Sequence, residues 1–369
     1  MKRIAFVVNV DWFFESHRLP LAIEALDRGW DVFLISKNTG RFEQLSGLGI
    51  NCISIDFERS GKNPLRELKH ILKLKEIYKT INPDIIHHIT LKPSIYGTIA
   101  SKRIKAKVIN AVSGLGYSFT DNRRSLSKII LIQLLKWAFK DKKSNFIFQN
   151  PDDKLIYDEL KFLNSTNYVI IKGAGVDENK YRYVLPTEKD RIQIILAARM
   201  LKDKGVFEFI AAANLLKEKY QNKARFILVG AIDLDNPAYI TADELNLLCD
   251  QRYIVWKGYE SDMKKVYEEA DIACLPSYRE GLPKSLIEAM AIGRPIVTTD
   301  AIGCRECVDD NVNGLIVPIK DVEKLAEVIE TLILDKNLRI EMGLKSRMKM
   351  EKEMSLNYVV SSTFTFYEA

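Results

Sequence analysis

Two glutamates eight residues apart are the first feature of this sequence that could do chemistry. Between Glu280 and Glu288 stand a glycine and then Pro283. Proline is well tolerated at the first position of a helix, because the N–H that it lacks has no partner there. We therefore expect Glu280 in a loop and Glu288 in the second turn of a helix that opens at Pro283.

The start of this helix has the properties of an anion site. The apolar run 272–275 shortly precedes it and predicts a strand, so the helix would begin near a strand end. A helix N-terminus offers free N–H groups and a partial positive charge, which suit a phosphate. The two carboxylates can accept hydrogen bonds from hydroxyl groups. A ligand with a phosphate and several hydroxyls, such as a nucleotide sugar, would fit both features.

Two cations lie where another strand is expected to end. Arg199 follows the apolar run 193–197, and Lys204 precedes Gly205 in the turn before the next helical segment. Two fixed cations at this edge can neutralise a diphosphate leaving group without a metal ion. No Asp-x-Asp motif is placed for a metal, so we expect neither a metal nor another cofactor.

The elements that must position these residues alternate along the whole chain. Strands are predicted at 4–8, 31–35, 52–55, 85–88, 107–110, 145–148 and 168–171, and then at 193–197, 225–229, 253–256, 272–275, 295–299 and 315–317. Helical segments such as 18–28, 65–79, 206–219, 263–270 and 322–334 lie between most of them. This alternation predicts an α/β fold with parallel sheets covered by helices. Two such series predict two doubly wound, Rossmann-like domains with ligands at the carboxyl ends of the strands.

The boundary between the two series is expected near residue 175. Gly173 and Gly175 interrupt the pattern after a strand, and the next strand begins only at 193. The first domain is therefore predicted at 1–175 and the second at 176–350. The polar helical stretch 338–367 has a break near Ser355, so 351–369 is predicted as a C-terminal helix that crosses back to the first domain.

Charge is distributed unevenly between the two halves. Residues 1–176 carry 28 Lys and Arg against 17 Asp and Glu, whereas the rest of the chain carries 27 and 32. The first half is therefore expected to face something anionic, either a phospholipid surface or nucleic acid. The alternative is a chance excess of solvated lysines.

One segment of the first half, 123–143, combines an apolar helix with cations at both ends. Its candidate membrane-surface residues are Arg123, Arg124, Lys128, Lys136, Trp137, Phe139 and Lys140. Interfacial membrane helices have this composition, although a helix packed on a parallel sheet with solvated lysines could look similar. The apolar run 129–139 favours lipid over nucleic acid.

Several other classes are disfavoured. The five cysteines form no disulfide framework, and Cys304 and Cys307 make a lone CxxC without a second pair or a nearby histidine, so ordinary reduced thiols are expected. No stretch reaches the roughly 20 apolar residues of a membrane span, and the N-terminal run is expected to be a buried strand rather than a signal peptide. A Rossmann dehydrogenase or epimerase would need a Gly-x-Gly-x-x-Gly after the first strand, where the turn 9–15 contains no glycine.

Taken together, these motifs resemble the retaining nucleotide-sugar glycosyltransferases of family 4, which have the GT-B fold. The resemblance rests on Arg199 with Lys204, on EGLPKSLIEAMAIGRP (280–295) and on NGLIVP (313–318), with PDIIH (83–87) and GVD (175–177) in support. In the first half, SHRLP (16–20), HHITLKP (87–93) and NAVSGLGY (110–117) are similar to the branch that builds lipid-linked bacterial surface polysaccharide such as O-antigen or capsule. Members of that branch add a hexose or an N-acetylhexosamine, often N-acetylgalactosamine, to a sugar on undecaprenyl diphosphate.

The resemblance implies roles for the donor side. Glu280 would bind hydroxyls of the donor sugar and Glu288 those of the ribose, while Arg199 and Lys204 would hold the diphosphate. Backbone near the sugar or the base would come from Gly281, Leu282 and the neighbours of Pro283, from Trp256 and Gly258, and from Gly114 and Gly116. Ser113 would contact a hydroxyl or a substrate water. Many family members have a histidine where this chain has Val112 and Ser113, so that role does not transfer.

The acceptor side is less well defined. His17 and Arg18 would lie at the first strand–helix turn and face the acceptor diphosphate, with His88, Thr90 and Lys92 as further candidates. His87 is expected to be structural, because neighbouring strand residues point to opposite faces and the two histidines cannot both point inward. Asp11 and Glu15 are candidate general bases at the cleft edge, with solvated loop acids as the alternative.

The resemblance then implies a reaction and a location. A UDP-sugar would react by same-face attack, with the leaving phosphate taking the acceptor proton and no protein nucleophile. The acceptor would be a polyprenyl-diphosphate-linked saccharide, with a soluble or hexose acceptor as the alternative and a nucleic-acid-binding protein as a remote one. We expect a cytoplasmic enzyme that is peripheral on the inner face of the bacterial membrane, with no nucleic acid partner.

Overall fold

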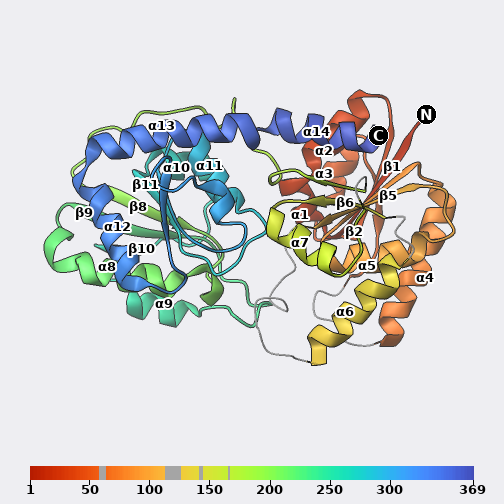
Figure 1. Ribbon diagram of the computed structural model, residues 1–369, viewed down its shortest axis with the longest axis horizontal. Helices are drawn as coiled ribbons and strands as arrows, with labels where there is room; N and C mark the ends of the chain where they lie inside the picture. Colours follow the sequence, from red (N-terminus) through yellow and green to blue (C-terminus); the bar gives the residue numbers. More distant parts are fainter. Residues whose placement is uncertain (58–63, 113–125, 141–143, 165–166) are drawn as a thin grey trace. The chain divides into compact units, whose positions relative to one another are not determined.

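Two parallel β-sheets, each covered by helices on both faces, make up the chain (Figure 1). The computed structural model describes residues 1–57, 64–112, 126–140, 144–164 and 167–369. The chain divides into two units, Met1–Ala174 with Val359–Ala369, and Gly175–Tyr358. The prediction of two doubly wound domains is therefore confirmed for the fold.

The sheet of the first unit has seven parallel strands in the order β3-β2-β1-β4-β5-β6-β7. These strands are β1 (Arg3–Val10), β2 (Asp31–Lys37), β3 (Asn51–Ser54), β4 (Ile85–Ile89), β5 (Lys107–Val112), β6 (Asn145–Phe148) and β7 (Tyr168–Ile170). Their apolar runs are buried on both faces, as expected when helices cover both sides of a parallel sheet. The strand order reverses between β1 and β4, which is where a doubly wound sheet usually binds ligands.

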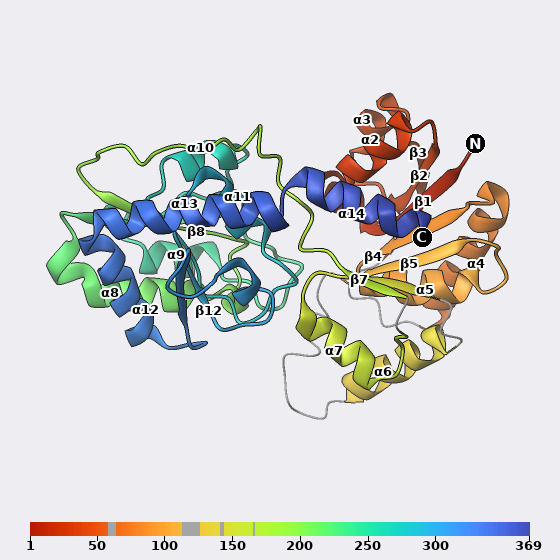
Figure 2. The same ribbon diagram turned by 45° about the horizontal axis from the view of Figure 1, so that its top comes forward.

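Two layers of helices cover this sheet (Figure 2). One face packs against α4 (Pro64–Ile81), α5 (Leu91–Ser101), α6 (Leu126–Phe139) and α7 (Pro151–Glu159). The other packs against α1 (Asp11–His17), α2 (Leu19–Asp27), α3 (Phe42–Gly47) and α14 (Leu356–Glu368). Every residue of the central strand β4 is therefore buried, whichever face it points to.

The second unit repeats the plan with six parallel strands in the order β10-β9-β8-β11-β12-β13. They are β8 (Ile192–Ala197), β9 (Ala224–Val229), β10 (Ile254–Trp256), β11 (Ile272–Leu275), β12 (Ile296–Thr299) and β13 (Gly314–Val317). The helices of the unit are α8 (Val206–Tyr220), α9 (Ala242–Leu248), α10 (Met263–Glu268), α11 (Lys284–Ile292), α12 (Val322–Leu334) and α13 (Lys336–Glu353). Here the order reverses between β8 and β11, the two strands that precede Arg199 and Glu280.

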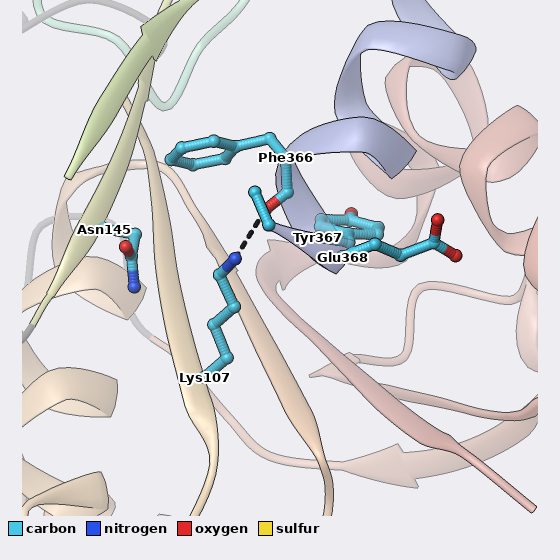
Figure 3. A pocket seen from close by; sticks show the side chains of 6 residues that line it. Lys107, Asn145, Phe366, Tyr367 and Glu368 are labelled. Atoms are coloured by element: carbon cyan, nitrogen blue, oxygen red, sulfur yellow. Dashed lines mark hydrogen bonds between the residues drawn. The ribbon is translucent and has the colours of Figure 1, made fainter. Parts of the chain in front are cut away.

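The chain ends on α14, which returns to the first unit as predicted. The expected start at 351 falls inside α13, and the break lies at Met354 and Ser355 instead. Figure 3 shows Lys107, at the start of β5, donating a hydrogen bond of 2.6 Å to the Phe366 carbonyl. A pocket of about 520 Å³ lies there, lined by Lys107, Asn145, Phe366, Tyr367, Glu368 and Ala369. It lies at the amino ends of β5 and β6, opposite the edge where such sheets bind substrates.

The helix predicted at 18–28 is confirmed as α2, but a preceding helix was not predicted. This helix, α1, begins at Asp11, directly at the end of β1, and α2 follows after Arg18. Arg18 has φ −135°, which is outside the helical range and separates the two helices. Asp11 and Glu15, expected in a loop, are therefore helical residues.

Candidate active site

The first part of the site is a contact between residues from the two donor-side motifs. Lys204 Nζ lies 2.5 Å from Glu280 Oε1. The side chains are 13% and 15% exposed, so the pair is largely shielded but still open to solvent at the carboxyl edge of the second sheet. Because β8 and β11 are neighbours, residues 76 apart in the sequence meet at one edge. A bound ligand could compete with either partner of this ion pair.

Glycine brings the turn of Lys204 onto the end of β11. Gly205 has φ +72°, and a Cβ at this position would lie 2.1 Å from the Pro276 carbonyl oxygen. Only glycine adopts this backbone conformation without strain, and only a residue without a side chain allows so close an approach. Gly205 therefore fixes how near Lys204 comes to the loop of Glu280.

The Glu280 loop is held from behind by the segment after β12. The Glu280 amide donates to the Ile302 carbonyl at 2.9 Å. Gly303 packs against the same loop, because a Cβ there would lie 2.4 Å from the Glu280 carbonyl oxygen. Ser277 Oγ adds a hydrogen bond of 3.0 Å to the Asp203 carbonyl, which ties this loop to the Lys204 turn. Contacts on two sides therefore fix the Glu280 loop within the second unit.

Arg199 takes a different partner. Its Nη1 forms an ion pair with Asp233 Oδ2, and its side chain is about half exposed. Asp233 belongs to the loop that follows β9. This loop therefore sets the orientation of one of the two cations expected to bind the diphosphate.

Glu288 lies in the second turn of α11, as the spacing predicted. The helix itself begins at Lys284, and Pro283 is its N-cap with extended backbone rather than its first helical residue. Glu288 is buried, and Oε1 accepts a hydrogen bond of 3.1 Å from the Tyr181 hydroxyl. Lys284 Nζ lies 3.8 Å from the same oxygen. Burial raises the pKa of this carboxyl, while Lys284, Tyr181 and Lys180 act in the opposite direction.

The strand ends expected to meet the nucleotide base are linked by backbone contacts. Trp256 Nε1 donates to the Gly230 carbonyl at 3.1 Å, and the Gly230 amide donates to the Gly258 carbonyl at 2.7 Å. Gly230 has φ +149°, and a Cβ there would lie 1.7 Å from the Ala198 carbonyl oxygen. Leu282, by contrast, buries its side chain in the core, so only its backbone could reach a ligand.

Asp11 was predicted as a candidate general base, and the structure corrects this. Its side chain is fully buried and accepts hydrogen bonds from the amides of Thr39, Arg41 and Trp12 at 2.7, 3.1 and 2.8 Å, and from the Thr39 hydroxyl. Burial alone would raise the pKa of Asp11, but these hydrogen bonds outweigh it and lower the pKa. A carboxylate that is fully used in fixing a turn is a poor proton acceptor.

His88 was predicted on the acceptor side, and it is also an interior residue. It is fully buried between the Tyr78 hydroxyl, 3.0 Å from Nε2, and Asn110 Oδ1, 2.9 Å from Nδ1. Gly97 leaves the space for the ring, because a Cβ there would lie 2.1 Å from His88 Nε2. Burial lowers the pKa of His88 to about 4.

His87 is structural as predicted, and its ring contacts the Tyr367 hydroxyl of α14 through Nδ1. The expectation that only one of the two histidines points inward was wrong. They do point to opposite faces of β4, but helices cover both faces of the sheet. Both rings are therefore buried.

The remaining acceptor candidates are divided between surface and interior. Arg18 is buried and donates to the His17 carbonyl at 2.9 Å, and burial lowers its pKa to about 10. Thr90 has φ +74° and a buried side chain oxygen. Three candidates are partly exposed. His17 stacks on Phe13 with ring centroids 4.1 Å apart. Glu15 forms an ion pair with Arg41 at 3.3 Å, and Lys92 forms one with Glu67 at 3.0 Å. Arg18, predicted to face the acceptor diphosphate, is thus a buried residue.

The α6 helix has one core face and one open face. Phe139 is 1% exposed and packs among Phe146, Tyr157 and Phe162, so its prediction as a membrane-surface residue was wrong. Trp137 is 52% exposed, with Lys102 5.3 Å from its ring centroid. Lys136 and Lys140 are exposed as well. Ser113, Gly114, Gly116, Arg123 and Arg124 lie outside the described residues, as does the side chain of Lys128.

Three further observations concern the expectations from the sequence. Within the described ranges, no group of three or more His, Cys, Asp or Glu side chains is arranged to hold a metal ion, and the expectation of metal-independent chemistry stays a prediction. No helix within those ranges has the length and apolar character needed to cross a membrane. Cys304 and Cys307 are free and buried, like Cys249 and Cys274.

The fold is that of the two-domain GT-B glycosyltransferases. The chain overlays Anabaena HepE, solved in complex with UDP and glucose, with a TM-score of 0.80 over the full length of both chains at 17% identity. Residues 177–349 match the family model for glycosyl transferases group 1, and residues 3–150 match that for glycosyl transferase 4-like domains. The chain belongs to this family of glycosyltransferases.

Two named relatives are similar over most of the chain. The N,N'-diacetylbacillosaminyl-diphospho-undecaprenol alpha-1,3-N-acetylgalactosaminyltransferase of Campylobacter jejuni is 31% identical over 356 residues, which is 92% of each chain. The UDP-Gal:alpha-D-GlcNAc-diphosphoundecaprenol alpha-1,3-galactosyltransferase of Escherichia coli is 21% identical over 84% of this chain and 82% of its own.

Sequence reasoning missed three residues that shape the site. Tyr181 holds Glu288, Asp233 holds Arg199, and Gly303 supports the Glu280 loop. Asp233 follows the predicted strand 225–229 by four residues, so the end of that strand was a usable signal. Tyr181 and Gly303 contact their partners only through the folded chain, so no local spacing pointed to them.

Proposed function

We propose that this enzyme transfers a sugar from a UDP-sugar to a saccharide on undecaprenyl diphosphate, with retention of the anomeric configuration. The observation that carries the proposal is the contact of Lys204 with Glu280 at the carboxyl edge of the second sheet. It joins the cation expected at the diphosphate to the carboxylate expected at the sugar. The names of the two relatives, which both act on diphospho-undecaprenol-linked sugars, support the acceptor.

In this proposal the charges of the second unit stabilise the departing UDP. Arg199 and Lys204 offset the negative charge that develops on the diphosphate, together with the amides at the start of α11. The α11 N-cap Pro283 makes no side-chain capping bond in the described structure, and its carbonyl accepts hydrogen bonds from the amides of Leu286 and Ile287 at 3.1 and 3.3 Å. Glu280 binds hydroxyls of the transferred sugar. The leaving phosphate accepts the proton of the acceptor hydroxyl.

The donor we propose is UDP-N-acetylgalactosamine or another UDP-N-acetylhexosamine. The relative with 31% identity carries N-acetylgalactosaminyl transfer in its name. A hexose donor is the second candidate, because the Escherichia coli relative is named for UDP-galactose. A panel of UDP-sugars with a synthetic prenyl-diphosphate saccharide separates the two, and the same panel with the saccharide lacking its lipid tests for a soluble acceptor.

Substitution of the charged pair tests the site. Glu280→Ala and Lys204→Ala should each reduce transfer below detection while thermal unfolding stays that of a folded protein. Full activity in Glu280→Ala would reject the site. Transfer should also persist in EDTA, since fixed cations take the place of a metal ion. Strict metal dependence would reject the proposed leaving-group chemistry.

We propose further that the first unit binds the anionic inner face of the cytoplasmic membrane through α6 and its neighbour α4. Ile129, Ile130 and Trp137 are exposed on α6, beside Lys136 and Lys140. On α4, exposed Leu68 and Leu72 alternate with exposed Lys69 and Lys73. Both helices contact α5 and cover one face of the sheet (Figure 2). Apolar side chains surrounded by cations suit an anionic lipid surface.

Vesicle flotation tests this surface. Trp137→Glu and Leu72→Glu should each reduce flotation of the full chain with vesicles rich in phosphatidylglycerol. The matched control is Leu215→Glu, an exposed leucine on α8 of the second unit near Lys217. This control should float like the unmodified protein. Equal loss in all three variants, or binding to duplex DNA in place of vesicles, would contradict the membrane surface.

A further inference from the structure

Tyr181 joins the segment that opens the second unit to the carboxylate expected at the ribose. Its ring is buried, and its hydroxyl donates a hydrogen bond of 3.1 Å to Glu288 Oε1, 107 residues further along the chain. We propose that Tyr181 is a positioning residue, which holds the Glu288 carboxylate in the orientation that accepts the ribose hydroxyls of the nucleotide. The inference rests on the proposed function, because it requires Glu288 to meet a ribose.

The position of Tyr181 is fixed by contacts on both sides. Its amide donates to the Asp177 carbonyl at 2.9 Å, and Asp177 Oδ1 accepts from the amides of Asn179 and Lys180, which shapes the turn before the ring. From α13, Arg347 Nη1 donates both to the Tyr181 carbonyl at 2.6 Å and to the Ala291 carbonyl at 2.7 Å. Ala291 lies one turn beyond Glu288 on α11. One guanidinium therefore binds the backbone of the tyrosine to the helix that carries the glutamate.

Glu288 needs such a partner because it is a buried carboxylate. Lys284 Nζ, one helical turn away, lies 3.8 Å from Oε1, beyond hydrogen-bonding distance. The tyrosine hydroxyl is closer, and its ring has far fewer accessible rotamers than a lysine side chain. A carboxylate can accept about four hydrogen bonds. After the bond from Tyr181 it retains the capacity to accept two from the adjacent hydroxyls of a ribose.

Phenylalanine would fill the same space without the donor. In Tyr181→Phe the carboxylate loses its fixed orientation, and a hydrogen bond to a charged group is among the stronger contributions to binding. The substitution should therefore weaken the binding of ligands with ribose hydroxyls and leave the binding of ligands without them unchanged. A merely structural role would weaken both kinds of ligand alike.

Calorimetric titration of the full chain with UDP and with 2′,3′-dideoxy-UDP separates these roles. We expect Tyr181→Phe to weaken UDP about tenfold and to leave dideoxy-UDP within about twofold of the unmodified protein. The Michaelis constant for the UDP-sugar should rise by a similar factor with kcat little changed, as when a contact made equally in the ground state and the transition state is lost. An equal loss for both nucleotides, or no loss for UDP, would overturn the inference.

A matched control removes a hydroxyl from another tyrosine–glutamate pair of the same unit. Tyr220 donates to Glu330 Oε1 at 2.7 Å, between α8 and α12. Tyr220→Phe should leave the titrations with both nucleotides unchanged. Combined with Glu288→Gln, Tyr181→Phe should add little further loss of UDP affinity, since the two residues act as one. Full additivity would count against positioning.

Failure of this inference is distinguishable from failure of the proposed function. If the unmodified protein neither binds UDP nor transfers a sugar, the proposed function is wrong and the inference fails with it. If transfer proceeds but UDP and dideoxy-UDP bind the unmodified protein equally, the ribose role of Glu288 and the positioning role of Tyr181 are rejected while the glycosyltransferase activity stands.

Discussion

Polar residues at the carboxyl edges of the two sheets differ in their solvent exposure and in their hydrogen-bond partners. In the second unit, Lys204 and Glu280 meet at the edge and keep some solvent exposure. In the first unit, Asp11 and His88 stand near the ends of β1 and β4 but are fully buried and hydrogen-bonded within the fold. The two sheets share a topology of parallel strands that reverses at one point. Topology thus indicates where a ligand can bind, and side-chain partners decide which residues remain available to it.

The difference lies in what each charged or polar group would give up on binding a ligand. Lys204 and Glu280 would give up one contact between two side chains, which a phosphate or a hydroxyl could replace. Asp11 would have to leave three backbone amides, and a buried amide without a partner is costly. Residues of the second kind stabilise the fold, whereas residues of the first kind are free to do chemistry.

The largest effect expected from this comparison is a separation of activity from stability at the second edge. Glu280→Gln should reduce transfer by at least about a hundredfold, because the proposed function places this charge next to the reacting sugar. The free energy of unfolding should fall by only about 1–2 kcal/mol, because glutamine keeps an acceptor oxygen for Lys204 and the largely shielded lysine still reaches solvent. Initial rates and urea unfolding of the same preparation measure the two quantities. A large loss of stability would place the pair with the buried residues of the first unit.

The next effect is the reverse outcome at Asp11. Asp11→Ala leaves the amides of Thr39 and Arg41 without their acceptor and should cost about 3 kcal/mol of unfolding free energy. Urea unfolding measures it, and the folded fraction of the variant should keep its kcat. A general base would behave differently, with a kcat that collapses while stability is preserved. That result would support Asp11 as the general base.

The buried His88 at the edge of the first sheet predicts a dependence of stability on pH. Burial lowers the pKa of His88 from 6.5 to about 4, so the folded protein binds a proton at this site less readily than the unfolded chain. The contribution to stability is complete above pH 6.5 and decreases as the pH falls toward 4, by about 3 kcal/mol in total. Urea unfolding between pH 7 and 4 should show the decrease, and His88→Gln should reduce the slope. A slope unaffected by the substitution would mean that His88 does not titrate in this window.

The sequence predicted the strands and the donor motifs well, for a physical reason. A strand buried on both faces is a continuous apolar run, which is readable without knowledge of its neighbours. Lys204 and Glu280 each stand just after such a run, and parallel strands bring their ends to one edge. The positions of both residues therefore followed from local patterns and the general properties of a doubly wound sheet.

The acceptor side could not be predicted in the same way, because its outcome depends on distant contacts. The Asp11 carboxylate accepts hydrogen bonds from the amides of Thr39 and Arg41, which come close to it only when β2 pairs with β1. His88 depends on a space that Gly97 leaves in α5. Phe139 is an exception, because its spacing from Leu135 repeats every four residues on a helix and indicates a core face. Its burial was readable from the sequence.

The smallest effect expected concerns charge on the outer surfaces of the two units. The first half of the chain has an excess of cations and the second an excess of acids. Lys136 is exposed on α6 and should contribute about 1 kcal/mol to binding an anionic lipid surface, so Lys136→Gln should weaken vesicle binding about fivefold. Lys265 is exposed on α10 of the second unit, and Lys265→Gln should leave binding unchanged. Higher salt should reduce the difference between the two variants, because screening weakens interactions between exposed charges. If both substitutions weaken binding equally, the membrane responds to net charge alone, and the contrast between the two units does not extend to their surfaces.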